Sequence, residues 1–239
     1  MWLQELRDAL YPPVCLLCRV RPTAAAPLCE ACAGSMPRSR PPLCDRCGLP
    51  LPGSPEPAGR CRACCAAPPA FAQARAPWQF ADRTQDAIHA FKYRQHRRIG
   101  RWLADGMSVT ARAAFPLPQI RGVVPVPQHW LARRLRGADP AGELAAAVSR
   151  ALEKPYVPRA LRCLRRTASQ TRLSWEARQA NVREAFAPSR PLRPGAYLLI
   201  DDVLTSGATA HACAAALRTA GAETVFVLTA ARTPLEPAA

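Results

Sequence analysis

Eight cysteines within the first 64 residues form four Cys-x-x-Cys motifs, a spacing that suits metal coordination. Two thiolates three residues apart bind one side of a tetrahedral ion, and a second motif completes the four ligands of structural zinc. The motifs are Cys15 and Cys18, Cys29 and Cys32, Cys44 and Cys47, and Cys61 and Cys64. The set predicts about two structural zinc ions per chain, because four sulfurs for each ion leave no position open for catalysis.

The spacing alone does not decide which motifs share an ion. The simplest arrangement has two sequential sites, but a crossed arrangement of alternate motifs uses the same ligands. Disulfides are the alternative to metal. Glu5 and Asp8 lie where an export signal would be apolar, so we expect no export, a cytoplasmic protein and reduced thiols.

Few apolar residues separate the cysteine motifs, where proline, glycine and arginine dominate. We therefore expect metal binding to supply the folding free energy of this segment, on the order of 10 kcal/mol or more per site. Farther along the chain, Cys163 and Cys213 are isolated. Cys213 lies in an alanine-rich stretch and is predicted to be a small buried residue.

A second group of chemically competent residues lies near the C-terminus. Residues 196–200 form an apolar run typical of a buried parallel strand, and Asp201 and Asp202 follow at its end. An alanine-rich helix and a strand at residues 225–228 come next, so the order predicts a βαβ unit. The turn before the helix contains Thr205, Ser206, Gly207, Ala208 and Thr209.

This turn has the chemistry of a phosphate site. A helix N-terminus offers free N–H groups and the positive end of the helix dipole. Gly207 permits a close backbone approach, hydroxyl groups flank it, and two nearby carboxylates suit sugar hydroxyls or Mg²⁺. The stretch matches neither a Walker A loop nor a dinucleotide glycine motif. We therefore expect a ribose 5-phosphate group here, the alternative being an ordinary strand-to-helix loop.

The elements that must position these residues alternate between strands and helices. They comprise a strand over 71–80, helices over 83–94 and 97–115, a strand at Val123–Val124, a broken helical region over 128–154, a loop over 167–171 and a helix from Ser174. We predict an α/β fold with a parallel sheet flanked by helices. We expect a domain boundary near residue 66, with an N-terminal helix and double zinc ribbon over 1–66 and the α/β domain over 67–239.

The positive charge is concentrated in the middle of the chain. The whole chain has 33 Lys plus Arg, 17 Asp plus Glu and a net charge of +16. Residues 83–183 hold 20 basic and six acidic residues, a net charge of +14, which favours a polyanionic partner. Four aromatic residues interleave with these cations and could stack bases, although core packing is the default for aromatic residues: Phe91, Tyr93, Trp130 and Trp175. No apolar run is long enough to span a membrane.

The ordered combination of motifs resembles a known family. The stretch LLIDDVLTSGAT is similar to the signature that binds phosphoribosyl pyrophosphate (PRPP) in type I phosphoribosyltransferases. Four cysteine motifs, then FKY, VVPVP, R-x-x-x-Q, NVREAF and this signature together resemble the ComF family of competence-associated proteins. The resemblance extends over nearly the whole chain and implies a type I phosphoribosyltransferase-like fold behind a zinc ribbon.

The resemblance also implies roles for particular residues. Asp201 and Asp202 would bind the ribose hydroxyls of PRPP, directly or through Mg²⁺, and the turn at 205–209 would bind the 5′-phosphate. A pyrophosphate-side loop would consist of Val124, Pro125, Val126 and Pro127. A mobile loop would include Arg165, Arg166, Thr167 and Gln170. The partners that the resemblance implies are PRPP, single-stranded DNA, and proteins of DNA uptake or of helicase and recombination complexes.

Two departures from the family pattern are visible. The family reads R-G-F-N-Q after the VPVP segment, whereas Gly137 is followed here by Ala138, Asp139 and Pro140, which puts a ligand role for that segment in doubt. Ser206 stands where threonine is commoner and keeps the hydroxyl.

The sequence leaves three functions open. The first is a ComF-type protein of DNA uptake that binds PRPP-Mg²⁺ and single-stranded DNA; if it is catalytic, the reaction displaces pyrophosphate from C1 of ribose. The second is a nucleic-acid-binding module that keeps the fold without turnover, and the third is a nucleobase salvage phosphoribosyltransferase. The residues identify neither a general base nor an acceptor, so enzyme activity is itself an open question.

Overall fold

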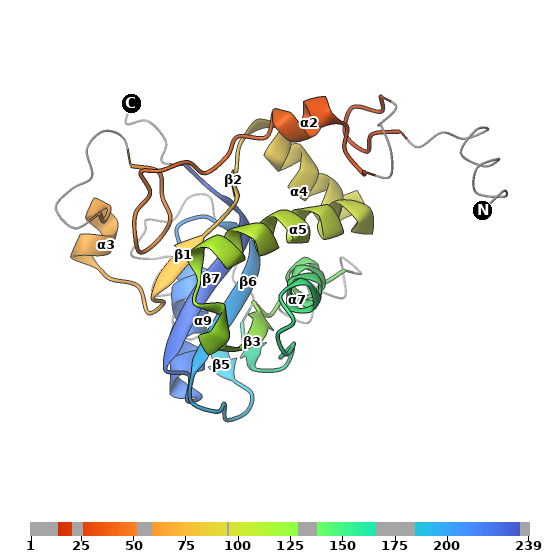
Figure 1. Ribbon diagram of the computed structural model, residues 1–239. Coiled ribbons are helices and arrows are strands. Elements are labelled where there is room, and N and C mark those ends of the chain that lie inside the picture. The colour runs from red at the N-terminus through yellow and green to blue at the C-terminus, as the bar shows by residue number, and fades with distance from the viewer. Residues whose placement is uncertain are drawn as a thin grey trace.

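A computed structural model describes residues 14–20, 26–51, 59–94, 96–128, 138–165 and 185–234. Its centre is a parallel sheet in the order β1, β7, β6, β3, with β2 also paired to β7 (Figure 1). The strands of this sheet are β1 (Gln73–Arg75), β2 (Trp78–Gln79), β3 (Ile120–Pro125), β6 (Ala196–Leu204) and β7 (Thr224–Arg232). The α/β architecture predicted from the sequence is confirmed.

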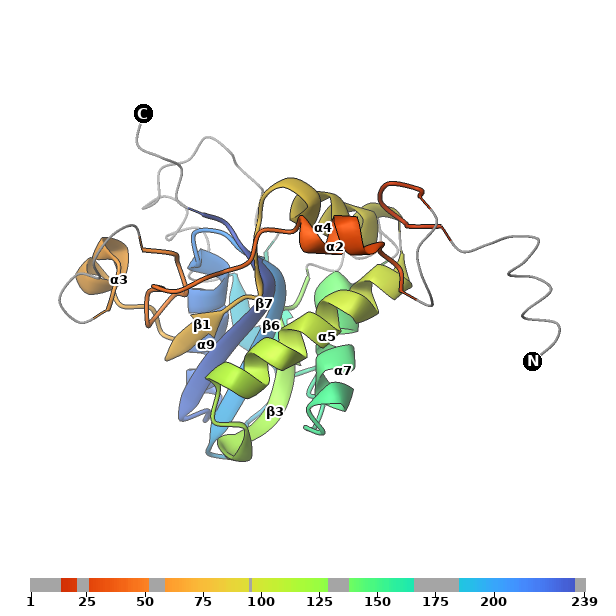
Figure 2. The same cartoon turned by 45° about the horizontal axis from the view of Figure 1, so that its top comes forward.

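Helices cover both faces of the sheet. Figure 2 shows α5 and α7 over one face, with α9 on the opposite side of the strands. The helices are α2 (Glu30–Gly34), α3 (Arg62–Ala66), α4 (Asp82–Arg94), α5 (Arg97–Ala114), α7 (Pro140–Ala151) and α9 (Ala208–Thr219), with a 3₁₀ turn at Leu117–Gln119. One apolar core lies under α4, α5 and α7, and a second lies under α9.

Strand β6 is the buried centre of the sheet. Its residues Leu198, Leu199 and Ile200 are fully buried, because β3 and β7 pair with it on its two sides and helices cover both faces. An uninterrupted apolar run is what a strand buried on both faces requires. This explains why residues 196–200 could be recognised as a strand from the sequence.

The helices over the first core follow their apolar spacing. Ile99, Leu103 and Met107 recur at intervals of four residues on α5, and all three are fully buried. Helix α7 begins at the departure from the family pattern. The Asp139 side chain accepts a hydrogen bond from Gly142 N at 3.0 Å, and Pro140 occupies the first turn, where a missing N–H costs nothing. In this chain the segment therefore starts a helix.

The cysteine-rich segment packs against both faces of the sheet. Leu28 and Met36 join the core under α4 and α5, whereas Leu49 joins the core under α9. Backbone pairing adds to this contact, since Ala74 N of β1 donates to Arg46 O at 2.7 Å. The few apolar residues between the motifs are thus buried by the sheet domain.

Three features differ from the sequence-based expectation. The predicted strand at 71–80 is two short strands separated by Ala76 and Pro77, because proline cannot donate to the ladder. Strand β6 extends past Ile200 to Leu204, so both aspartates lie within the strand. The antiparallel pair β4 (Leu161–Cys163) and β5 (Phe186–Pro188) was not predicted, since three-residue strands carry little periodic signal.

Several expectations concern residues outside the described ranges. The N-terminal helix, the loop over 167–171 and the helix from Ser174 all lie there. Among the described residues, no helix is both long and apolar enough to cross a membrane.

Gly106 of α5 should not tolerate a side chain. A Cβ at this position would lie 2.3 Å from the Trp78 ring, which is buried and stacked on Trp102 with ring centroids 5.0 Å apart. Because that ring cannot move away, we expect Gly106→Ala to lower the free energy of unfolding by about 1–3 kcal/mol. Urea denaturation measures the change. Gly34→Ala is the control, since its Cβ meets nothing within 4 Å, and an equal loss there would contradict the steric explanation.

Candidate functional site

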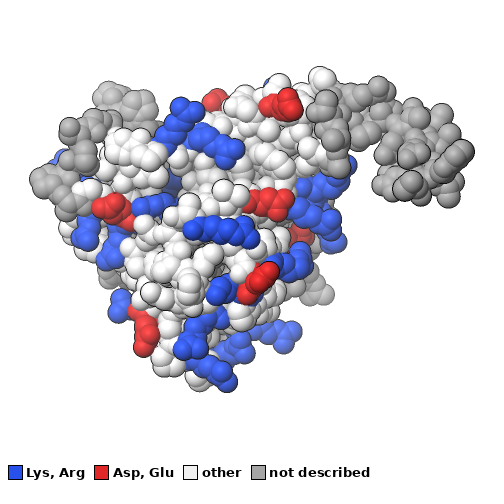
Figure 3. Space-filling view, in the orientation of Figure 1, with Lys and Arg blue, Asp and Glu red and all other residues white. Residues whose placement is uncertain are grey.

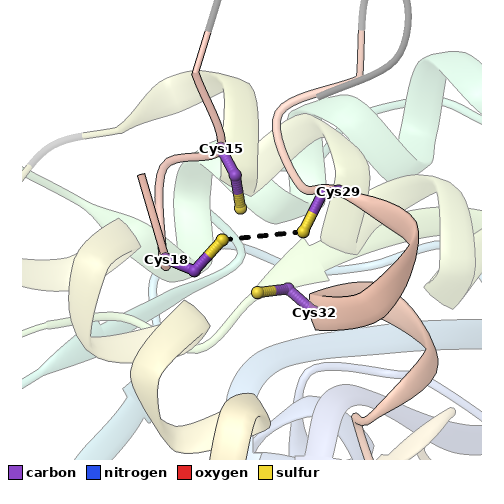
Figure 4. Close-up of side chains that lie close together, drawn as sticks. All are labelled: Cys15, Cys18, Cys29 and Cys32. Atoms are coloured by element: carbon purple, nitrogen blue, oxygen red, sulfur yellow. Dashed lines mark hydrogen bonds between the residues drawn. The ribbon is translucent and has the colours of Figure 1, made fainter. Parts of the chain in front are cut away.

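The structure brings the cysteines of consecutive motifs together. The sulfurs of Cys15, Cys18, Cys29 and Cys32 all lie within 4.8 Å of one another. Figure 4 shows the four side chains converging on one point from a turn and from the start of α2, with Cys18 Sγ 3.6 Å from Cys29 Sγ. Tetrahedral zinc with Zn–S bonds of 2.3 Å needs sulfurs about 3.8 Å apart. The donor set and its spacing therefore fit zinc.

A second group of four sulfurs has the same compactness. Cys44, Cys47, Cys61 and Cys64 are all buried and also lie within 4.8 Å of one another. Cys47 Sγ is 3.7 Å from Cys61 Sγ, and Cys44 Sγ accepts hydrogen bonds from the N–H groups of Cys47 and Cys61. Both groups follow the sequential arrangement.

The sulfurs of the second group interact strongly with one another. A hydrogen bond from the Cys64 thiol lowers the pKa of Cys47 to about 4, with a further contribution from the positive charge of Arg232. The same interaction and burial raise the pKa of Cys64. One sulfur is thus held as a thiolate, the form that binds zinc.

The predicted phosphate turn joins β6 to α9. Gly207 is the N-cap residue of α9 with φ +85°, a left-handed conformation that favours glycine. A Cβ built on Gly207 would meet no protein atom within 4 Å, so the space above this backbone is open. Thr205 and Ser206 are exposed, Thr209 is half-buried and Ala208 is buried. The turn therefore presents hydroxyl and backbone groups to an open region at a helix N-terminus.

A buried arginine holds this turn, which the sequence analysis did not identify. Arg232 is 8% exposed and lies at the end of β7, beside Leu204 of β6. Its Nη1 donates to the carbonyl oxygens of Leu204 at 3.0 Å, Thr233 at 3.0 Å, and Thr205. Charged donors bind carbonyls more strongly than neutral ones. Arg232 thus fixes the backbone at the start of the turn, and its charge also acts on Cys47.

Helix α9 is tied at its first turn to the segment that follows the zinc ribbon. Ala70 N, in the segment between the second cysteine group and β1, donates to His211 Nδ1 at 3.1 Å. Sequence alone gave no signal for this contact, because the two residues are 141 positions apart. The second cysteine group therefore lies close in structure to the phosphate turn.

The two aspartates lie on opposite sides of β6. Leu198 and Ile200 pack under α5 and α7, whereas Leu199 packs under α9. Side chains alternate along a strand, so Asp202 lies on the α4 side and Asp201 on the α9 side. Burial, and then the charge of the Asp201 carboxylate, raises the pKa of Cys213, which is buried on α9 as the sequence predicted.

The aspartate pair is crowded and partly buried. Burial and the Asp202 carboxylate raise the pKa of Asp201 to about 7, against the opposing effect of Lys92. Lys92 Nζ on α4 lies 2.8 Å from Asp202 Oδ1, an ion pair that the sequence did not predict. Carboxylate oxygens are ligands of the kind that Mg²⁺ prefers.

The VPVP segment lies beside the aspartates. Pro125 of β3 pairs with Ile200, and Val126 N donates to Ile200 O at 2.9 Å. Val124 and Val126 are buried and Pro127 is half-buried, so the segment offers mainly backbone to a ligand. Parallel pairing therefore places this segment and the aspartates at one edge of the sheet.

The predicted mobile loop is described only at its first residue. Arg165 is exposed just beyond β4. Arg166, Thr167 and Gln170 lie outside the described residues.

Comparison with known sequences finds relatives along the chain. The family described as "Double zinc ribbon domain" matches residues 6–65. "DNA utilization protein YhgH" of Shigella flexneri is 30% identical over 238 residues, which cover 93% of this chain and 98% of that protein. "Competence protein F" of Haemophilus influenzae is 29% identical over 151 residues, 61% of this chain and 66% of that protein. The match to competence protein F thus spans slightly less than two thirds of its length.

Comparison with solved structures finds a PRPP amidotransferase and an enzyme of purine biosynthesis. The glutamine PRPP amidotransferase of B. subtilis, complexed with ADP and GMP, matches 59% of this chain and 30% of its own, with 18% identity and a TM-score of 0.38. An allosteric regulatory enzyme of purine biosynthesis matches 60% of this chain and 30% of its own, with 18% identity and a TM-score of 0.40. The chain spans about a third of each structure.

Metal content should follow the two cysteine groups. We expect about two zinc ions per chain in the purified protein, and about one after Cys44→Ser, because three sulfurs leave the second site without its full ligand set. Elemental analysis by plasma mass spectrometry measures the ratio of zinc to protein. Cys65→Ser is the matched control, since the Cys65 thiol is exposed and belongs to neither group. An unchanged ratio in Cys44→Ser would contradict the assignment.

Proposed function

The chain belongs to the ComF family of competence-associated proteins, and from that premise we propose that it binds PRPP with Mg²⁺ and single-stranded DNA in the cytoplasm. Its role would be DNA uptake or utilization, as the names of its relatives indicate for those proteins. The observation that carries the PRPP part is the open turn at Gly207 beside two carboxylates at one edge of the sheet.

The ligand would be divided among three groups at this edge. The turn would bind the 5′-phosphate through its N–H groups, its hydroxyls and the helix dipole. Asp201 and Asp202 would bind the ribose hydroxyls or hold Mg²⁺, which shields phosphate charge when bound. The backbone of the VPVP segment, paired to Ile200, would face the pyrophosphate.

Turnover, if it occurs, would rest on positioning. Displacement of pyrophosphate at C1 breaks the C1–O bond and forms a bond to an acceptor, with positive charge developing on the ribose ring. Residues that hold the phosphate, ribose and pyrophosphate in place would orient C1 and stabilise that charge. Arg232 would support this indirectly, because it fixes the carbonyls of Leu204 and Thr205 at the start of the turn.

The DNA part of the proposal rests on exposed cations along α5 and α7. Figure 3 shows Lys and Arg side chains predominating over Asp and Glu on the face where these helices lie. A groove of about 260 Å³ between the two helices is lined by Arg97, Arg101 and Arg150, with Glu143 as an acidic neighbour. The Arg97 side chain is 78% exposed, and its ion pair with Glu143 is long, with 4.0 Å between Nε and Oε1. Its charge is therefore available to phosphate.

An exposed aromatic residue lies just before α5. Tyr93 is 65% exposed near the end of α4, and its ring centroid is 5.9 Å from that of His89. Stacking of a base on such a ring is worth about 1–3 kcal/mol. By contrast, Phe91 is buried and belongs to the core. These two aromatic residues therefore have different environments, and the other two singled out from the sequence, Trp130 and Trp175, lie outside the described residues.

PRPP binding should depend on the aspartate pair. We expect the protein to bind PRPP-Mg²⁺ in isothermal titration calorimetry, and Asp201→Asn combined with Asp202→Asn to weaken binding at least about tenfold, since charge-assisted contacts are worth about 1.5–3 kcal/mol each. Asp105→Asn is the control, because Asp105 is an exposed carboxylate on α5. No heat from the wild-type protein would refute the PRPP proposal.

The same preparation separates the catalytic alternatives. Pyrophosphate release from PRPP is measured alone, with single-stranded DNA, and with a panel of nucleobases. Release only with nucleobases would identify a salvage enzyme, and binding without release would identify a module without turnover.

DNA binding should weaken when the groove loses its charge. We expect the triple variant Arg97→Gln, Arg101→Gln and Arg150→Gln to reduce the slope of log affinity against log salt by about 2, because each phosphate contact on a single strand contributes about 0.7. Fluorescence anisotropy of a labelled single strand measures the slope.

A matched control removes the same charge elsewhere. Arg121, Lys154 and Arg193 line a groove of about 800 Å³ at the starts of β3 and β6, the opposite edge of the sheet. Changing all three to glutamine should leave the slope nearly unchanged. Equal effects of the two triple variants would show that total charge, not the α5–α7 groove, governs binding.

A further inference from the structure

Lys92 is held inside the proposed PRPP site by a sheltered ion pair. Its Nζ lies 2.8 Å from Asp202 Oδ1, and the two side chains are 20% and 13% exposed. In the Arg83–Asp86 pair on the same helix, the two side chains are far more exposed, at 45% and 56%. A pair sheltered to this degree is screened weakly by salt and water. Lys92 therefore neutralises Asp202 in the ligand-free protein.

The site needs this cation when no ligand is present. Two adjacent carboxylates lie on β6, and burying an unpaired charge is costly. Arg232, on the neighbouring strand β7, donates its Nη1 group to backbone carbonyls instead. Lys92 also opposes the rise in the pKa of Asp201, so its charge acts on both carboxylates.

The same ion pair conflicts with metal binding. A divalent cation that uses Asp202 must displace Lys92 or lie beside its positive charge. Mg²⁺ gives up water reluctantly and is usually held by one or two carboxylates together with substrate phosphates. A lysine is a compact charge on a flexible stem and can move from a carboxylate to a phosphate without leaving the site.

We propose that Lys92 is an exchangeable counter-ion that makes cation and anion binding interdependent. Without ligand it occupies Asp202, so a divalent cation alone binds weakly. When a pyrophosphate group enters, Lys92 moves to that anion and Asp202 becomes free for the metal. The inference rests on the proposed function, because it assigns the aspartate edge to a phosphate-bearing ligand. Such coupling is reciprocal by linkage.

The first arm of the test uses Mn²⁺ alone, read by electron paramagnetic resonance on the zinc-loaded full chain. We expect Lys92→Met to bind Mn²⁺ at least about fivefold more tightly than wild type, the lower range of allosteric couplings. Lys154→Met is the matched control, since Lys154 is the other lysine of the chain and lies in the groove at the opposite edge. Unchanged or weaker Mn²⁺ binding in Lys92→Met would overturn the proposal.

The second arm uses pyrophosphate alone, without divalent metal. Asp202→Asn releases Lys92 while keeping the side-chain shape, so we expect pyrophosphate to bind at least about fivefold more tightly than to wild type. Asp105→Asn should have no effect. Weaker or unchanged binding in Asp202→Asn would overturn the exchange, and this arm stays informative even if Lys92→Met does not fold.

The two proposals fail in different ways. Absence of PRPP binding by wild type would refute the proposed function while leaving the Mn²⁺ comparison readable. Normal PRPP binding with no Mn²⁺ gain in Lys92→Met would refute only the counter-ion role.

Discussion

Parallel pairing of β6 with β3 on one side and β7 on the other is the constraint on which the rest of the structure depends. All three strands run in one direction, so their ends meet at one edge of the sheet. Asp202, the VPVP segment and Arg232 each lie at or near the end of one of these strands. A register shift of one residue would turn the aspartates to the wrong faces. The buried run at Leu198–Ile200 opposes such a shift, because its side chains pack in two different cores.

The zinc ribbon contributes to both of those cores. Cys15 and Cys32 belong to the core under α4 and α5, whereas the cysteines of the second group belong to the core under α9. The second group also lies near the phosphate turn, through the charge of Arg232 and through the Ala70–His211 hydrogen bond. The second cysteine group and the turn are thus linked through Arg232 and His211. The zinc would be structural, and its second site would lie near the proposed ligand site.

The positive charge that marks the middle of the chain has more than one location among the described residues. Arg97 and Arg101 lie at the start of α5, whereas Arg121 and Lys154 lie at the far edge of the sheet. Lys92 belongs to neither group, since it is committed to Asp202. Composition treats these cations as one excess, but the fold gives them different surroundings and different chemistry.

The sequence by itself determined the local features: four zinc-binding motifs, the strand-turn-helix order around Gly207, and the amphipathic spacing of α5. Each depends on neighbours within a few residues, which is why spacing and periodicity reveal it. Only the tertiary structure decided that consecutive motifs share a site, that Arg232 holds the turn, and that Lys92 pairs with Asp202. These contacts join residues that are far apart in the chain, so local sequence patterns do not reveal them. The two short strands β4 and β5 were missed for the same reason, because their order comes from pairing with each other.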